Sequence, residues 1–315
     1  MSSPEHVPPV ALSGVAYCLP GKVVDAHVWA ARCGQPAERA AALLDNGARY
    51  FHDAAGESPA ELATRAVRLL LASARTTPDS IDALVYTHTI QSSVIAPPAG
   101  TAHQIQSRAG LRGALAFSVS QQNCVSPFAA IRTVRALMAH RSPISRAIVV
   151  CADLIVPGCD HLRAIHNLAL HSDGACAVLL ERGGTRNRIE SLYLYTDGRF
   201  FRGMDDDVQP VPDDRYYWSA FATMRTALGQ AGARSDQIAC VLPHHVNLPG
   251  WRRLMAMLGI AQDRLIAGNF ARIGHVFGAD PFINFHDRER KAAGERSLLF
   301  SSGLAGCFGA MVVRH

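Results

Sequence analysis

The residue with the clearest chemical potential is a cysteine at the boundary between a polar and an apolar segment. In SVSQQNCVSPFAAIRTV, residues 118–134, Cys124 ends a polar run and Pro127 opens an apolar pattern typical of a helix. A helix N-terminus lowers the pKa of a thiol, and its free backbone N–H groups can bind an oxyanion. Proline suits the first helical turn, where its missing N–H costs nothing. We interpret Cys124 as a candidate nucleophile, with a buried structural thiol as the alternative.

Two segments in the second half of the chain supply imidazoles. In LPHHVN, His244 and His245 follow an apolar run and precede Asn247, and GHVFGAD supplies His275 and Asp280. Adjacent side chains of an extended segment point in opposite directions, so we expect one imidazole of the pair to face a cleft. A histidine can serve as the base for a nucleophilic cysteine, and an aspartate can fix its tautomer. The alternative for GHVFGAD is a turn with a solvated histidine and a capping aspartate.

A glycine-bearing turn near the C-terminus is a candidate oxyanion region. The segment SSGLAGCFGA contains Gly303, Leu304 and Gly306, and it either brings backbone close to a substrate carbonyl or simply makes a tight turn. The chain has no Gly-x-Ser-x-Gly elbow, phosphate-binding loop or dinucleotide fingerprint. Its eight cysteines are scattered, without a Cys-x-x-Cys pair, which favours reduced thiols over a disulfide framework or a metal site.

Composition limits the classes of function. The chain has 315 residues, 49% of them hydrophobic and 18% charged, with a net charge of +5, which favours a large core over specific nucleic-acid binding. The N-terminus lacks the charged-then-apolar pattern of a signal peptide, and no apolar stretch reaches the ~18 residues of a membrane span. We therefore expect a cytoplasmic protein.

Three pairs of segments recur in the same order and indicate a duplication. Segment 62–89 resembles 220–246, 146–153 resembles 296–303, and 174–181 resembles 306–314. Helical and strand patterns alternate in both halves, which predicts an α/β fold with halves at 1–183 and 184–315. His275 then falls near the position that Cys124 holds in its own half. Pseudo-twofold halves would bring this thiol and the imidazoles to one central cleft.

These motifs together resemble the thiolase superfamily, and most closely its ketoacyl synthase III (3-oxoacyl-ACP synthase III) group. The resemblance is carried by AHQIQSRAGLRGALAFSVSQQNC, HSDGACAVLLE and VLPHHVN, which is similar to the group's Pro-His-Gln-Ala-Asn motif. It implies that Cys124 is the nucleophile, His244 the catalytic histidine and Asn247 the motif's asparagine. It also implies a five-layered αβαβα thiolase fold, a homodimer, a cysteine-bound acyl intermediate and no tightly bound cofactor.

The chain departs from the group's pattern at three places. His275 stands where the group has the asparagine of Gly-Asn-Thr-Ser, and the C-terminal triple glycine is reduced to GLAG. Of the group's N-terminal coenzyme A contacts, a Trp and an Arg, Arg49 is the candidate that remains. A carrier-protein-bound donor is then as plausible as coenzyme A, and Arg252 and Arg253 would suit an acidic carrier protein.

Three hypotheses follow. The first is an acyltransferase of specialised metabolite biosynthesis, in which Cys124 takes an acyl group from a thioester and His244 or His275 deprotonates a hydroxyl or amine acceptor. The second is decarboxylative Claisen condensation by Cys124, His244 and His275, because neutral imidazoles can donate hydrogen bonds to an enolate. The third is a non-catalytic subunit that binds a carrier protein. The resemblance favours the first, since some relatives that diverge at the asparagine position are acyltransferases.

Overall fold

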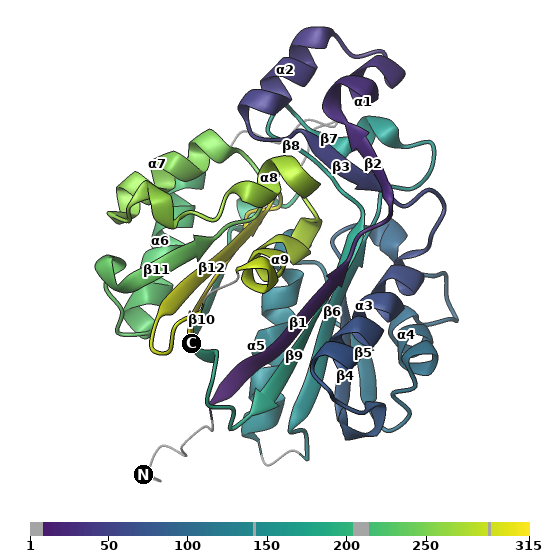
Figure 1. Cartoon of the computed structure of the whole chain (residues 1–315), viewed down its shortest axis with the longest axis vertical. Helices are drawn as coiled ribbons and strands as arrows, with labels where there is room; N and C mark the ends of the chain where they lie inside the picture. Colours follow the sequence, from purple (N-terminus) through teal and green to yellow (C-terminus); the bar gives the residue numbers. More distant parts are fainter. Residues whose placement is uncertain (1–8, 141–142, 204–213, 289–290) are drawn as a thin grey trace.

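The computed structural model describes residues 9–140, 143–203, 214–288 and 291–315. Its main sheet consists of two arrays of strands, one from each half of the chain (Figure 1). The first array has the order β1 (Val10–Cys18), β9 (Gly174–Arg182), β6 (Arg146–Asp153), β4 (Ala83–Thr87) and β5 (Leu115–Ser118). The second has the order β10 (Arg188–Thr196), β13 (Cys307–Arg314), β12 (Arg296–Gly303) and β11 (Ile238–Leu242).

The two arrays have the same topology. Strands β4 and β6 are parallel, while β6 with β9 and β9 with β1 are antiparallel. In the second array β11 and β12 are parallel, while β12 with β13 and β13 with β10 are antiparallel. The arrays meet through an antiparallel contact between β1 and β10, at Ala11 opposite Arg188.

Helices cover both arrays and fill the space between them (Figure 1). Helices α5 and α9 each contact strands of both arrays, so they form the central layer. One outer layer packs on the first array and the other on the second. The central layer is α5 (Ser126–Ala139) and α9 (Asp280–Asp287). The layer on the first array is α3 (Pro59–Ser73) and α4 (Thr101–Ala109), and the layer on the second is α6 (Tyr216–Gln230) and α7 (Leu248–Leu258). The predicted five-layered αβαβα thiolase fold is thus confirmed.

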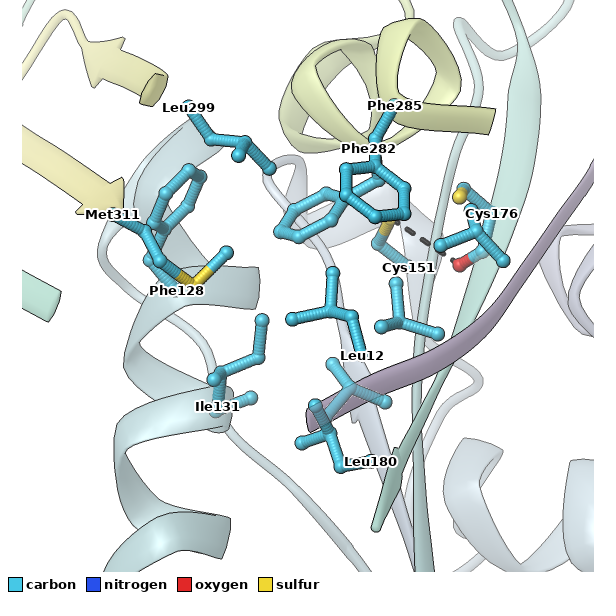
Figure 2. Packing of buried hydrophobic residues seen from close by; sticks show 14 of the residues in the cluster. Leu12, Phe128, Ile131, Cys151, Cys176, Leu180, Phe282, Phe285, Leu299 and Met311 are labelled. Carbon is cyan, nitrogen blue, oxygen red and sulfur yellow. Dashed lines mark hydrogen bonds between the residues drawn. The ribbon is translucent and has the colours of Figure 1, made fainter. Parts of the chain in front are cut away.

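The core of the central layer joins the two halves. Figure 2 shows Phe128 of α5 and Phe282 of α9 among side chains from strands of both arrays, including Leu12, Cys151 and Met311. The rings of Phe128 and Phe282 lie 5.3 Å apart. This packing fixes α5, which directly follows Cys124, and α9, which begins with Asp280.

The repeated segments form equivalent elements. Segment 62–89 contributes most of α3, the 3₁₀ turn Pro78–Ser80 and β4. Segment 220–246 contributes most of α6, the 3₁₀ turn Ser235–Gln237 and β11. The other two pairs correspond to β6 with β12 and β9 with β13. The predicted division at 183/184 falls between β9 and β10; that the two halves are separate domains stays a prediction.

A smaller layer covers one end of the first half, at the top of Figure 1. It consists of a two-stranded antiparallel sheet, two short helices and one short helix from the second half, packed around Trp29 and Phe51. These elements are β2 (Lys22–Asp25), α1 (Ala26–Arg32), α2 (Ala37–Asp45), β3 (Tyr50–Asp53) and α8 (Gly268–Ile273). In the described part of the chain, no helix has the length and apolar character needed to span a membrane.

Candidate active site

Cys124 lies at the junction that the sequence predicts. It sits in a 3₁₀ turn, Asn123–Val125, that leads directly into α5, with Pro127 in the first turn of that helix. Its backbone carbonyl accepts a hydrogen bond of 3.0 Å from the Ser301 hydroxyl of β12. Around the thiol, Ile155 and Phe277 form a small apolar cluster, which favours an apolar acyl group at this position.

The prediction that the helix N-terminus lowers the pKa of this thiol is wrong. Burial raises the pKa of Cys124, because the thiolate would lose its hydration, and the Thr89 hydroxyl, 3.8 Å from Sγ, offsets this only in part. The effect of a helix N-terminus is small beside the cost of burying a charge. Burial therefore favours the neutral thiol, which would need a base in order to act as a nucleophile.

His275 is the candidate base by position. Its Nε2 atom lies 3.6 Å from Sγ of Cys124, and its Nδ1 atom lies 2.5 Å from Oδ2 of Asp280. Asp280 begins α9, is fully buried, and its Oδ1 accepts the N–H of Val276 at 2.7 Å. Gly274 lets the segment that carries His275 pass close to β3, because its φ is +71° and a Cβ there would stand 2.7 Å from the carbonyl oxygen of Tyr50.

The carboxylate determines the tautomer of His275. A carboxylate accepts hydrogen bonds, so Nδ1 carries the proton and Nε2 presents its lone pair to the thiol. Cys124, His275 and Asp280 are thus arranged as a candidate nucleophile, base and orienting carboxylate. The sequence predicted the Cys124 thiol and the imidazoles in one cleft, and the structure brings the thiol and His275 into direct contact.

His244 lies beside this triad with its ring turned toward two hydroxyls. Its Nε2 atom is 3.5 Å from both the Tyr216 hydroxyl and the Ser302 hydroxyl, and its ring centroid is 6.3 Å from that of His275. Its Nδ1 atom is buried without a hydrogen-bond partner among the described residues. Burial and the neighbouring His275 lower the pKa of His244 to about 3. The imidazole is therefore neutral at physiological pH.

His245 points elsewhere, as expected for adjacent residues of an extended segment. Its Nδ1 atom is 2.8 Å from the Gly274 carbonyl and 3.1 Å from Oδ1 of Asp280, and its Nε2 atom is 3.0 Å from Oδ1 of Asn284. Its backbone N–H also donates to Asp280, at 2.6 Å. Asp280 therefore contacts both His245 and His275.

Two further residues of the site were missed by the sequence reasoning. His171 is buried, stacks on Phe277 with ring centroids 4.4 Å apart, and lies 5.4 Å from His275. Its Nδ1 atom faces the Leu162 carbonyl at 3.0 Å, and burial with His275 lowers its pKa to about 3. Tyr216, the second, contacts His244. His171 is the first residue of HSDGACAVLLE, so this motif could have indicated it as a site residue. No motif in the sequence indicated Tyr216.

The glycine turn lies next to the nucleophile's own turn. It connects β12 to β13, and a Cβ on Gly303 would stand 2.4 Å from Cβ of Asn123, so the two backbones are in close contact. Gly306 has φ +70°, and its carbonyl accepts the N–H of Asp197 at 2.8 Å. Leu304 is partly exposed at the tip of the turn. The oxyanion role of Gly303, Leu304 and Gly306 stays a prediction.

The residues predicted to bind the donor lie outside the triad. Asn247 caps α7, accepting the N–H of Gly250 at 2.9 Å, and its amide donates to the Tyr217 hydroxyl at 3.2 Å. Arg252 and Arg253 are exposed on α7, with Arg253 over the ring of Tyr217 at 4.5 Å.

Arg49 is exposed in the smaller layer and lies 3.7 Å from Asp25. Leu248, at the start of α7, donates to the Asn46 carbonyl at 3.2 Å, so α7 borders the segment before Arg49. The donor-binding roles of Asn247, Arg252, Arg253 and Arg49 stay predictions.

Comparison with known proteins identifies the family. Residues 120–198 match the model of 3-oxoacyl-[acyl-carrier-protein (ACP)] synthase III, and residues 228–315 match the model of its C-terminal part. The chain belongs to the 3-oxoacyl-ACP synthase III family. The first match includes Cys124 and the second includes His244, His275 and Asp280.

Individual proteins and solved structures are similar to this chain over most of its length. A β-ketoacyl-ACP synthase III of Ruegeria sp. (strain TM1040) is 27% identical over 80% of this chain and 82% of its own length. The 3-oxoacyl-ACP synthase III (FabH) structure from Pseudomonas aeruginosa PAO1 covers 97% of this chain and 98% of its own, with a TM-score of 0.81 and 22% identity. A structure of the acyltransferase ChlB3 covers 98% of both chains, with a TM-score of 0.85 and 16% identity. The two structural likenesses establish the shared fold.

Proposed function

We propose that this synthase III-like protein is an acyltransferase that loads an acyl group from a carrier-protein or coenzyme A thioester onto Cys124 and passes it to a hydroxyl or amine. The observation that carries this proposal is the hydrogen bond from Nδ1 of His275 to Asp280, which leaves Nε2 as a lone pair facing Cys124. A fixed lone pair at the nucleophile serves proton abstraction and cannot donate to a substrate oxyanion. The departure from the group's asparagine thus replaces a donor with a base.

In the loading step, Nε2 of His275 takes the proton of Cys124 as Sγ attacks the thioester carbonyl carbon. The tetrahedral intermediate collapses with cleavage of the donor's C–S bond, and the imidazolium returns the proton to the departing thiolate. Asp280 keeps the proton on Nδ1 and stabilises the transient imidazolium. The products are an acyl-Cys124 thioester and the free donor thiol.

In the transfer step, Nε2 of His275 takes a proton from the acceptor hydroxyl or amine as that oxygen or nitrogen attacks the acyl carbon. The bond from the acyl carbon to Sγ breaks, and the Cys124 thiolate recovers the proton from the imidazolium. The new product is an ester or amide. General base help of this kind contributes about 10²–10⁴-fold to the rate.

Donor binding involves the arginines of α7. Arg252 and Arg253 are exposed on one helix that begins three residues after His245, so an acidic carrier protein bound there would deliver its thioester from this side. Arg49 and Asn247 would contact the donor's pantetheine or nucleotide portion. Replacing both arginines by glutamate should slow loading from acyl carrier protein and leave loading from an acyl-N-acetylcysteamine thioester unchanged.

Decarboxylative condensation by Cys124, His244 and His275 is the second candidate, and the family's curated relatives favour it by their names. That reaction needs two N–H donors on the thioester carbonyl to stabilise an enolate. His275 directs a lone pair to Cys124, and His244 faces the hydroxyls of Tyr216 and Ser302. This arrangement supports the base chemistry of the first candidate better.

One experiment separates the candidates. Purified protein is acylated with an acyl-N-acetylcysteamine thioester, and the acyl-enzyme is then given either a malonyl thioester or the generic acceptors glycerol and hydroxylamine. The acyltransferase is supported if the acceptor removes the acyl group from Cys124, and if this removal is faster in the wild type than in the acylated His275→Asn variant. Carbon dioxide release from the malonyl thioester overturns it. Absence of any acylation instead favours a non-catalytic subunit that binds a carrier protein.

We further propose that the protein acts as a cytoplasmic homodimer in specialised metabolite biosynthesis. The departures from the family pattern at His275 and in the GLAG turn support a role other than the condensation that the synthase names of the relatives indicate.

A further inference from the structure

We propose that His245 is held as an imidazolium cation that shares the carboxylate of Asp280 with His275, and that this cation keeps His275 neutral and available as a base. His245 is thus a positioning residue, which acts on Cys124 through Asp280 and His275. The inference deepens the proposed function, and it rests on the triad geometry of that proposal. Its test reads the protonation of the site, so it does not depend on which acceptor the enzyme uses.

The first argument is that both ring nitrogens of His245 face oxygen acceptors. Nδ1 lies 2.8 Å from the carbonyl oxygen of Gly274 and 3.1 Å from Oδ1 of Asp280. Nε2 lies 3.0 Å from Oδ1 of Asn284. A neutral imidazole has one N–H, so one of its nitrogens would direct a lone pair at an oxygen lone pair. The imidazolium satisfies both sides, inside a site where an unmet polar group is costly.

The second argument is that the Asn284 amide cannot be turned around. Its Nδ2 donates to the Pro243 carbonyl at 2.8 Å, and its Oδ1 accepts from Nδ2 of Asn269 at 2.9 Å. The Asn269 amide is itself fixed, because its Oδ1 accepts from Arg272, which can only donate, at 2.8 Å. Its Nδ2 donates to Asp287, which can only accept, at 3.0 Å. The chain of amides therefore presents an oxygen, not an N–H, to Nε2 of His245.

Of the two histidines that contact Asp280, His245 is the better place for the extra proton. The neutral form of His275 is fully satisfied, since Nδ1 donates to Asp280 and Nε2 faces a thiol that can donate to it. A second proton on His275 would direct an N–H at the neutral sulfur, a weak acceptor. His245 gains a strong acceptor for each proton, whereas His275 does not. The single carboxylate charge of Asp280 is therefore balanced by His245.

The surroundings of His245 agree with a cation. Burial alone opposes a charge there, but the charge and hydrogen bonds of Asp280, with those of Asn284 and Gly274, outweigh it and raise the pKa of His245. Interactions with His245 and His275 lower the pKa of Asp280 despite its burial. The remaining groups facing this ring are uncharged at neutral pH: the His244 imidazole, with a pKa of about 3, and the Phe270 ring at 5.2 Å.

The charge matters because an unbalanced carboxylate favours the protonated form of an imidazole beside it. A negative charge within a few ångströms raises the pKa of an imidazole by about one to three units, and a positive charge beside it opposes this effect. With His245 protonated, the charge of Asp280 is balanced, so that His275 is available to accept the Cys124 proton. The group's motif has glutamine at this position, so His245→Gln is a mild substitution that removes the charge and keeps a hydrogen-bonding side chain.

The direct test is ¹⁵N NMR of the histidine rings in the full-length protein. His245 can be assigned in the wild type by its contact with the Phe270 ring, so the measurement needs no variant. We expect both ring nitrogens of His245 to carry protons at pH 7, and His275 to carry its proton on Nδ1. A single N–H on His245 at pH 7 would overturn the inference.

The functional test is the rate of Cys124 alkylation by iodoacetamide against pH, followed by peptide mass spectrometry. Removing the cation in His245→Gln leaves the charge of Asp280 unbalanced beside the pair of Cys124 and His275, so the acidic limb should move up by about one pH unit. His286→Gln is the matched control, because His286 also contacts a carboxylate, Asp287, at 3.0 Å, but on the exposed side of α9. An unchanged or lowered limb in His245→Gln would contradict the inference, even if acyl transfer itself were confirmed.

Discussion

His275 holds its Nδ1 atom 2.5 Å from Oδ2 of Asp280, five residues further along the chain. One buried carboxylate at the start of α9 thus determines which nitrogen of the His275 ring points toward Cys124 and whether that nitrogen carries a proton. Without a proton it can act as a base toward the thiol, and with a proton it could only donate a hydrogen bond.

Cys124→Ala should abolish covalent acyl loading and leave the fold intact, because the Cys124 side chain contributes few packing contacts beyond its small apolar cluster. Intact-protein mass spectrometry after incubation with an acyl thioester measures the loading. Cys159→Ala is the matched control, since this half-buried thiol borders the same cluster. Equal loading of wild type and Cys124→Ala would disprove the assignment of the nucleophile.

His275→Asn should slow both loading and transfer by about 10²-fold or more, within the range for loss of a general base. Loading is affected as well as transfer, because burial raises the pKa of the Cys124 thiol and leaves it without a base in the variant. Rapid-quench mass spectrometry resolves the two steps. Transfer at the wild-type rate in His275→Asn would show that another group deprotonates the acceptor.

His244→Gln should weaken the dependence of stability on acid pH. The pKa of His244 is about 3 in the folded protein and near 6.5 when unfolded, so the unfolded state binds one more proton between these values. Stability from this group is therefore complete above about pH 6.5 and is lost as the pH falls, by about 1.4 kcal/mol per pH unit. Urea unfolding at pH 7.0, 5.5 and 4.5 measures the difference. Parallel pH profiles for wild type and variant would argue against a neutral buried His244.

The chain should form a homodimer through the free edge of β5. In the described residues β5 pairs with β4 at the end of the sheet, and its Leu115 is 54% exposed. An edge strand with an exposed apolar side chain is a surface on which a second copy can pair. Light scattering should give twice the chain mass of 33.9 kDa, and Leu115→Asp should lower it. Val28→Asp, at an equally exposed position on α1, should leave it unchanged. A monomeric wild type at micromolar concentration would exclude the dimer.

The repeated segments were enough to predict the two arrays of strands, because buried strands and their covering helices leave a periodic pattern in the sequence. Cys124 was found for a similar reason, since a polar run followed by Pro127 marks the start of a helix. The protonation state of the thiol could not be found in this way. It depends on how much solvent reaches Sγ, which is set by side chains such as Ile155 and Phe277 that are distant in sequence.

The sequence by itself determined the fold class, and it predicted the candidate nucleophile and most of the imidazoles around it, since each of these depends on local patterns of polarity and on short motifs. Only the tertiary structure decided how the imidazoles divide their tasks. His244 turns to the hydroxyls of Tyr216 and Ser302, while His245 and His275 meet at Asp280. The physical reason is that a tautomer and a charge are set by the donors and acceptors around a ring, and these come from β12, α6, α8 and α9, which only folding brings together.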